Sequence, residues 1–340
     1  GVRLGLSRIG GAGVAAPPAS AGVPVVQIDA LHGATNLIVA ELPVPGDDLP
    51  TAPVAVIAAA GVQPGWRSAE LFIEDSATGG LTSLGSTAPS ATIGSVAVTP
   101  VAEVGAALFD MRSAVEVELL NAAMLLSGAD DPALLNGANR ALLGREVIQF
   151  GEATRIGTTR WRLTRLLRGR RGTEWAMAAH ETGERFLLLE DDSLVTLPSD
   201  RVQMGATLLI DAIGIGDLTP AQAQENLSGQ AMLPPSPAHA HALYIGDTWQ
   251  LGWTRRSRAG WRWVDGADAP LGEEQELYRI TLLHDGAPIR SVETASPGWT
   301  YDAASIAADQ GAGVSGPVIV EIRQIGTHGA GRSATLEIAI

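Results

Sequence analysis

One segment, residues 146–175, constrains the fold more than any other because it combines a β-hairpin pattern with a concentration of arginine. Its first half opens with apolar strand residues, and Gly157 followed by Thr158 offers a turn. Its second half alternates, with Trp161, Leu163 and Leu167 on one face. The segment therefore predicts a β-hairpin.

The other face of this hairpin and the loop after it are basic. Eight arginines and three glutamates lie between Arg145 and Trp175, a local charge of +5 in a chain of net charge −14. Gly169 and Gly172 are turn residues in that loop. Three interpretations remain open: the arginines pair with acidic groups of a neighbouring subunit, with nucleic acid or anionic glycolipid, or with carboxylates of their own fold. The acidic remainder of the chain argues against a general nucleic-acid binder.

Tryptophans are the second class of candidate contact residue, because aromatic rings are costly to expose. For Trp261 and Trp263, packing over the end of a domain is the equally weighted alternative. The complete set of expected partner contacts is Arg165, Arg168, Arg170, Arg171, Trp175, Trp261 and Trp263.

The composition excludes several chemistries. The chain has no cysteine and no lysine, since all 23 basic residues are arginine. Disulfides, thiol chemistry, a Walker-type phosphate loop and a Schiff-base lysine are therefore excluded. No nucleophile elbow or Ser-His-Asp set is evident, and His239 and His241 have no third ligand of matching character nearby. We expect no enzyme activity, no catalytic residue, no cofactor, no metal site and no membrane span.

The chain divides by composition. Residues 1–24 are rich in Gly, Ala and Pro, which predicts a linker or an extended arm. Residues 25–216 hold apolar and alternating runs, among them a strand at 25–28 and the clear alternation at 115–119. They predict a β-rich domain, a β-sandwich or barrel, and leave open whether it is one domain or two.

The second half begins with a connector, residues 217–236. Thr219 and Pro220 predict a short helix over 219–227, because they suit a helix cap and its first position. The prolines of 234–237 predict a domain boundary with a flexible joint. Seven short strands follow in residues 237–340, with a tryptophan in the second, which resembles a fibronectin type III β-sandwich.

A resemblance to a known family rests on the central block. Its order is I-Q-F at 148–150, L-R-G-R-R-G-T-E-W-A-M at 167–177, His180 and then G-E-R-F at 183–186. This resembles the large baseplate protein, the megatron, of gene transfer agents and related long-tailed phages. The resemblance covers roughly residues 25–300, specifically in 134–190 and loosely before 100. Such proteins are much longer, so we expect this chain to be a piece of one.

The resemblance implies a structural protein of a phage-like tail tip or baseplate, which positions the assembly at the host envelope. It implies a homotrimer with the hub and distal tail proteins as partners, located in the particle, and leaves a host-surface glycan open as a further contact. The alternative from the residues is a carbohydrate-binding β-module of a secreted glycosidase or adhesin. Sequence-specific nucleic-acid binding is not expected.

Overall fold

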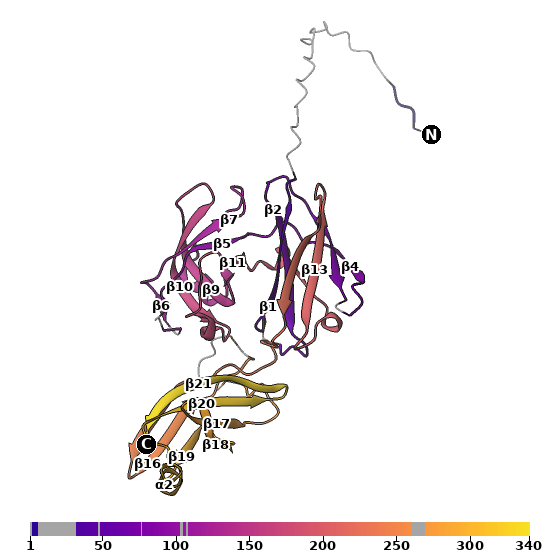
Figure 1. Cartoon of the computed structure of the whole chain (residues 1–340). Helices are drawn as coiled ribbons and strands as arrows, with labels where there is room; N and C mark the ends of the chain where they lie inside the picture. Colours follow the sequence, from indigo (N-terminus) through magenta and orange to yellow (C-terminus); the bar gives the residue numbers. More distant parts are fainter. Residues whose placement is uncertain are drawn as a thin grey trace.

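The chain is mainly β-sheet, which confirms the predicted fold class. Two β-cores that share a sheet form the N-terminal part, and a β-sandwich follows (Figure 1). The predicted arm and the predicted strand at 25–28 lie outside the described residues, apart from 2–5. The computed structural model describes residues 2–5, 32–46, 48–75, 77–102, 105–106, 108–259, 261 and 269–340.

A six-stranded barrel forms the first core. Its strands follow the order β9-β10-β7-β5-β11-β8, and β8 pairs with β9, so that the sheet closes on itself. Closure leaves no free edge among these strands. The short strand β6 pairs with the far part of β10. The bounds are β5 (Ile93–Val98), β6 (Phe109–Asp110), β7 (Val115–Leu119), β8 (Arg140–Leu143), β9 (Glu146–Arg155), β10 (Arg160–Arg170) and β11 (Arg185–Leu188), with helix α1 (Asp131–Leu135) before β8.

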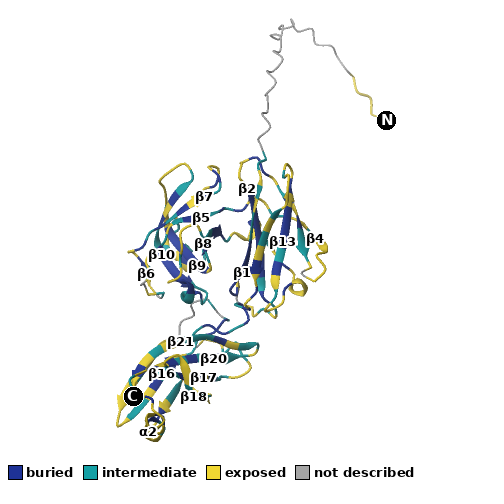
Figure 2. Ribbon diagram, viewed as in Figure 1, coloured by how far each residue is buried: buried dark blue, intermediate teal, exposed yellow. Residues whose placement is uncertain are grey.

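A middle sheet is shared by both cores, and much of it is buried (Figure 2). In β2, every residue after Val54 is buried. Ala58 and Ala60 belong to the barrel core, whereas Ile57 and Ala59 belong to the second core. A strand covered on both faces has a continuous apolar sequence, and small side chains let the backbones approach. The sheet has the order β1 (Thr35–Leu42), β2 (Val54–Gly61), β12 (Leu194–Thr196).

A third sheet covers the outer side of the second core. It has the order β14 (Ala221–Asn226), β13 (Thr207–Gly214), β3 (Ala69–Glu74), β4 (Leu81–Ser86). The connections hold the 3-10 helices η1 (Glu174–Ala176), η2 (Asp191–Ser193) and η3 (Ser199–Arg201). Within residues 25–216, the described part of the chain thus has two hydrophobic cores that meet at one sheet.

The helix predicted over 219–227 is wrong, because this segment contains strand β14. Ala223 pairs with Ile210 of β13. Glu225 is buried and Ala223 is half-buried, whereas Gln222 and Gln224 are exposed. This period of two belongs to a strand, and pairing with β13 outweighs the local helix-start signal. The sheet of the first part therefore extends beyond the predicted boundary at residue 216.

The predicted flexible joint is also corrected. Pro234, Pro235 and Pro237 are buried. A Cβ on Gly331 would lie 2.3 Å from the carbonyl oxygen of Pro234, so the connector backbone lies directly against the last hairpin of the chain. The prolines are apolar, and burying them against this hairpin holds the connector in place.

The C-terminal part is a sandwich of a three-stranded and a four-stranded sheet around one core. The orders β15-β16-β19 and β18-β17-β20-β21 confirm the predicted fibronectin type III-like sandwich. The unpredicted helix α2 joins β19 to β20, and the carboxylate of Asp302 caps it by accepting from the Ser305 N–H. The bounds are β15 (Ala238–Ile245), β16 (Thr248–Thr254), β17 (Tyr278–His284), β18 (Ala287–Thr294), β19 (Gly298–Tyr301), α2 (Ala303–Gly311), β20 (Pro317–Gly326) and β21 (Gly329–Ala339).

Candidate functional site

The arginine-rich hairpin forms as predicted, but its alternation ends near Arg165, and residues 166–169 are all buried. Leu163 is buried, as the pattern predicts. Arg165 has a positive φ of 56°, a left-handed conformation that is uncommon outside glycine. Beyond it, Leu166 and Arg168 are fully buried, whereas simple alternation places Arg168 on the exposed face. The register with β9 is constant from Trp161 to Leu167 and shifts once, before Arg170.

Arg168 is committed to its own fold. Its Nε and Nη2 donate to Oε1 and Oε2 of Glu146, each at 2.8 Å, and both side chains are 0% exposed. The N–H of Gly169 donates to the same Oε1 at 2.5 Å. The carbonyls of Val101 and Met177 accept the remaining guanidinium bonds. The prediction that Arg168 contacts a partner is therefore wrong, because its guanidinium group is buried and makes its hydrogen bonds within the barrel domain.

His180 joins this pair to form a cluster of four groups, Arg168, Glu146, His180 and Glu184, which we call the ion cluster. The Nε2 of His180 lies 2.6 Å from Oε2 of Glu146, and its Nδ1 lies 2.6 Å from Oε1 of Glu184. A ring with a carboxylate at both nitrogens donates from both, so it is an imidazolium. Burial opposes that charge, but the bonds to Glu146 and Glu184 outweigh it and raise the pKa of His180 to about 9.

The same balance acts on Glu146. Burial by itself would raise the pKa of this carboxyl group, but the hydrogen bonds from His180 and Arg168 and the positive charge of Arg168 hold the pKa below its ordinary value. The carboxylate is thus kept charged by its neighbours in the fold. The ion cluster ties β9, the end of β10 and the segment before β11 together.

The more exposed arginines of the hairpin are also paired. The Nη2 atoms of Arg160 and Arg162 lie 2.8 Å and 2.7 Å from the two carboxylate oxygens of Glu116 on β7. Arg165 pairs with Asp131 at the start of α1. Of the three interpretations of the arginine cluster, pairing with carboxylates of the same fold describes these residues.

The end of the hairpin reaches the boundary with the C-terminal part. Arg170 is half-buried and donates from Nε to Oε1 of the buried Gln149 at 2.9 Å. Arg171 donates to the carbonyl of Gly46 at 3.1 Å, and its guanidinium carbon lies 5.6 Å from the ring centroid of Trp261. Arg171 and Trp261 therefore meet across the boundary within one chain.

Trp175 makes a second contact across this boundary. The guanidinium carbon of Arg332, on β21, lies 3.6 Å from its ring centroid. Beside it, Nη2 of Arg256 lies 2.7 Å from a carboxylate oxygen of Glu174. Two of the three candidate tryptophans, Trp175 and Trp261, thus pack against groups of their own chain, and Trp263 lies outside the described residues.

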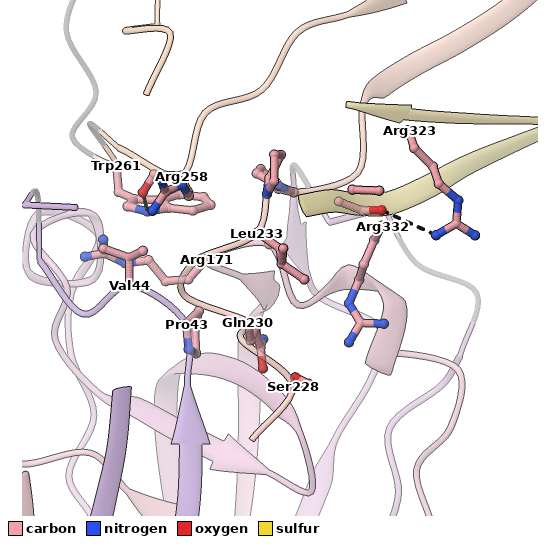
Figure 3. Close-up of a pocket in the computed structure, with 15 residues that line it drawn as sticks. Pro43, Val44, Arg171, Ser228, Gln230, Leu233, Arg258, Trp261, Arg323 and Arg332 are labelled. Atoms are coloured by element: carbon pink, nitrogen blue, oxygen red, sulfur yellow. Dashed lines mark hydrogen bonds between the residues drawn. The ribbon is translucent and has the colours of Figure 1, made fainter. Parts of the chain in front are cut away.

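A cavity of about 220 Å³, which we call the junction cavity, lies where these contacts meet. Figure 3 shows Arg323 and Arg332 on one side of it, and Arg171, Arg258 and Trp261 on the other. Half of the other lining residues belong to the segment that follows β14: Ser228, Gln230, Leu233, Pro234 and Pro235. Two further hollows next to it, lined in part by Arg140 and Arg170, share Arg171 with the junction cavity.

Several residues of this region escaped the sequence analysis. His180 and Glu184 stand four apart, but in a loop, where that spacing does not predict a contact. Arg332 lies in a strand far from the hairpin, and its contact with Trp175 depends entirely on how the two parts of the chain pack. The density of arginine, the candidate tryptophans and the motif block that includes His180 pointed to this region, but no pattern predicted these contacts.

The described part of the chain holds no group of three or more His, Asp or Glu side chains arranged as metal ligands. No helix within the same residues is long and apolar enough to cross a membrane.

A comparison with protein-family models matches the barrel. Residues 91–187 match the family model described as Rcc01698-like, C-terminal. A comparison with curated protein sequences finds no match. Similar solved structures include a two-domain fibronectin type III segment of chicken tenascin, with 9% identity, 72% of this chain and 99% of that chain covered, and a TM-score of 0.23. Domains d3–d4 of the rat CD45 extracellular region have 6% identity, 45% and 72% coverage and a TM-score of 0.24. Scores this low bear on neither fold nor function.

Proposed function

We propose that this chain is a structural component of a phage-like tail tip or baseplate, of the kind built by the megatron proteins of gene transfer agents. The observation that carries the proposal is the family match over residues 91–187, because this range contains strands β5 to β10 of the barrel and all but the last residue of β11. The motif block that resembles the megatron lies mostly within the same range.

The internal packing supports a scaffolding role. The barrel and the second core share the sheet β1-β2-β12, and the connector to the C-terminal sandwich is buried rather than exposed. A component of an assembly must hold its contact surfaces in a fixed relation, and short buried connections do this better than a free linker. In this function the ion cluster serves to fix the end of the arginine-rich hairpin.

The partners follow from the same proposal. The chain would form a homotrimer in the tail tip, with the hub and distal tail proteins as neighbours, and would lie near the host envelope. Arg171, Trp175 and Trp261 are then joint residues between the parts of one subunit, and subunit contacts use other surfaces. Arg165 and Arg170 are half-buried and each has a partner within the chain.

Labelling of particles tests this function. Gly79 and Gly80 lie in an exposed turn after β3, so an epitope tag placed between them should not disturb either core. Immunoelectron microscopy of particles carrying the tagged protein should place the label at the end of the tail. Untagged particles are the control. Label on the capsid, or particles that contain none of the chain, would contradict the proposal.

A carbohydrate-binding module is the second candidate, and one observation favours it. Tyr244 is 56% exposed and its ring centroid lies 5.1 Å from that of Trp249 on the β15-β16 hairpin. Exposed aromatic rings suit stacking on sugars. If this is the function, Tyr244→Ala should abolish retention of the chain on an immobilised host-surface glycan, whereas Tyr278→Phe, a change in the core, should leave retention intact.

A further inference from the structure

The junction cavity is unusually basic for a chain with a net charge of −14. Four arginines line it, and its described lining residues include no aspartate and no glutamate. The other lining groups are apolar or neutral, including Ser228 and Gln230. A concentration of guanidinium groups around a hollow is a recognised arrangement for binding anions.

Three of the four arginines have oxygen partners elsewhere. Arg258 lies 2.6 Å from Glu273, and both side chains are almost fully buried. Arg323 lies 3.1 Å from Glu321 at a more exposed position. Arg171 donates to a backbone carbonyl. These bonds fix the positions of the three side chains at the cavity, and the carboxylates of Glu273 and Glu321 offset two of the three charges.

Arg332 differs from the other three. Its guanidinium group stacks on Trp175 at 3.6 Å, and no oxygen atom of the described residues accepts a hydrogen bond from it. A guanidinium group has five N–H donors, and none of those of Arg332 has an acceptor among the described residues. The stacking holds the plane of the group, which lowers the cost of ordering it around a ligand.

The surroundings of Arg332 are also electrostatically unfavourable to its charge. Burial, together with the positive charges of Arg145 and Arg323, holds the pKa of Arg332 below its ordinary value, although Glu41 acts in the opposite direction. Glu41 is occupied: its Oε1 and Oε2 accept bonds from the N–H groups of Gln230 and Ser228 at 2.7 Å and 2.8 Å. A bound anion would supply the missing acceptor and offset the repulsion between the arginines.

The side-chain amide of Gln230 adds a second observation. Its Nε2 is buried beside the cavity and has no hydrogen-bond acceptor among the described residues. A buried donor without an acceptor is costly, and a ligand or a water that the ligand orders can satisfy it. Two unsatisfied donor groups of different residues therefore face the same small space.

We propose that the junction cavity binds an oxyanion, a phosphate or carboxylate group, with Arg332 as its main anchor. Guanidinium forks bind both kinds of group through paired hydrogen bonds. A cavity of about 220 Å³ accommodates a single such group with a small substituent. The group comes either from a free anion or from the acid group of a sugar. Because the cavity is walled by both parts of the chain, a bound anion also strengthens their contact.

Isothermal titration calorimetry of the full chain at low salt tests this site. The probes are inorganic phosphate, glucuronate and neutral glucose. We expect saturable binding of phosphate or glucuronate and none of glucose. Tight binding of glucuronate with weak binding of phosphate would assign the sugar acid as the source, and the reverse would assign the free anion. Both outcomes support the site.

Variants locate the binding. Arg332→Gln should weaken the affinity by roughly tenfold to a hundredfold, because it removes charge-assisted hydrogen bonds. Arg332→Lys should recover part of it. The matched control is Arg279→Gln. Arg279 is an exposed arginine on β17 that pairs with Glu293 of β18, so this substitution should change the affinity less than about twofold. Circular dichroism confirms that each variant is folded.

Three outcomes would overturn the proposal. The first is an absence of saturable binding of either anion to the wild-type chain. The second is equal loss of affinity in Arg332→Gln and Arg279→Gln, which would show a diffuse charge effect. The third is unchanged affinity in a folded Arg332→Gln chain. None of these results bears on a role in a tail tip, because the particle-labelling experiment does not depend on an anion.

Discussion

Replacement of His180 by glutamine should remove a defined pH dependence from the stability of the barrel. In the folded chain both ring nitrogens lie 2.6 Å from carboxylate oxygens, and the side chain is 3% exposed. The pKa of His180 is raised from 6.5 to about 9. Each unit of such a shift corresponds to about 1.4 kcal/mol, so the protonated histidine contributes roughly 3 kcal/mol to the free energy of unfolding.

The direction follows from the raised pKa. The contribution is fully present below the pKa of the unfolded chain, 6.5, and is lost as the pH rises through about 9. Urea unfolding monitored by circular dichroism, from about pH 6 to about pH 9.5, measures it. His180→Gln should be less stable than the wild type by roughly 3 kcal/mol at the lower end. The difference should shrink by most of that amount at the upper end.

His241→Gln is the control, because its ring is exposed on strand β15 and, among the described residues, its one hydrogen-bond partner is the carbonyl of His239. The control should keep the pH dependence of the wild type. If the wild-type stability does not change across this range, or if His180→Gln lowers it equally at every pH, the ion cluster does not hold a charged histidine and the reasoning fails.

Three further predictions concern packing. Arg168→Met should lower the free energy of unfolding by about 3–5 kcal/mol, because it leaves the buried Glu146 without its main partner; a loss below about 1 kcal/mol in urea unfolding would show that the pair is unimportant. Gly94→Ala should cost about 1–3 kcal/mol, since its Cβ would lie 2.2 Å from the carbonyl oxygen of Glu118, whereas Gly105→Ala, with nothing within 4 Å, should be nearly neutral; equal effects in thermal denaturation would contradict the barrel register. Limited proteolysis should not cleave within residues 234–237, because the prolines are buried. A first cleavage there would show that the connector is a flexible joint after all.

The fold was predictable where short-range periodicity decides it. The alternation at 115–119 became β7, with Val115 and Val117 buried, and the C-terminal sandwich has the seven predicted strands, β15 to β21, in the described residues. The hairpin of 146–170 formed as well. In these segments one face of the strand packs on a core and the other faces solvent. Apolar and polar residues therefore alternate in the sequence with the period of two that a strand has.

The failures arose where a long-range contact outweighs a local signal. Thr219 and Pro220 favour a helix start, but the following residues pair with β13. The helix α2 had a usable signal, since Asp302 precedes an alanine-rich run that ends near glycine, but the surrounding strand pattern concealed it. The proline run predicted the position of the boundary correctly, but it also predicted a flexible joint. The prolines are instead buried against the hairpin of β20 and β21, far away in the sequence, which no local pattern shows.

The candidate site was predictable only as a region. The density of arginine identified the hairpin and its exit, and Arg171, Trp175 and Trp261 do lie together at the junction. The burial of Arg168 was not predictable, because the end of β10 is buried on both faces, from Leu166 to Gly169, whereas simple alternation would expose every second residue. Arg332 was not predictable either, because no local pattern distinguishes it from other strand arginines.

The central claim is that this chain builds part of a phage-like tail tip, and a cryo-electron microscopy map of the tail end of particles from the producing cell tests it most directly. We predict three symmetry-related copies of density that fit the barrel, the shared sheet and the C-terminal sandwich, with the connector of 234–237 packed against the last hairpin. A complete tail-tip map in which every density is explained by other proteins, together with no peptide of this chain in the particles by mass spectrometry, would contradict it.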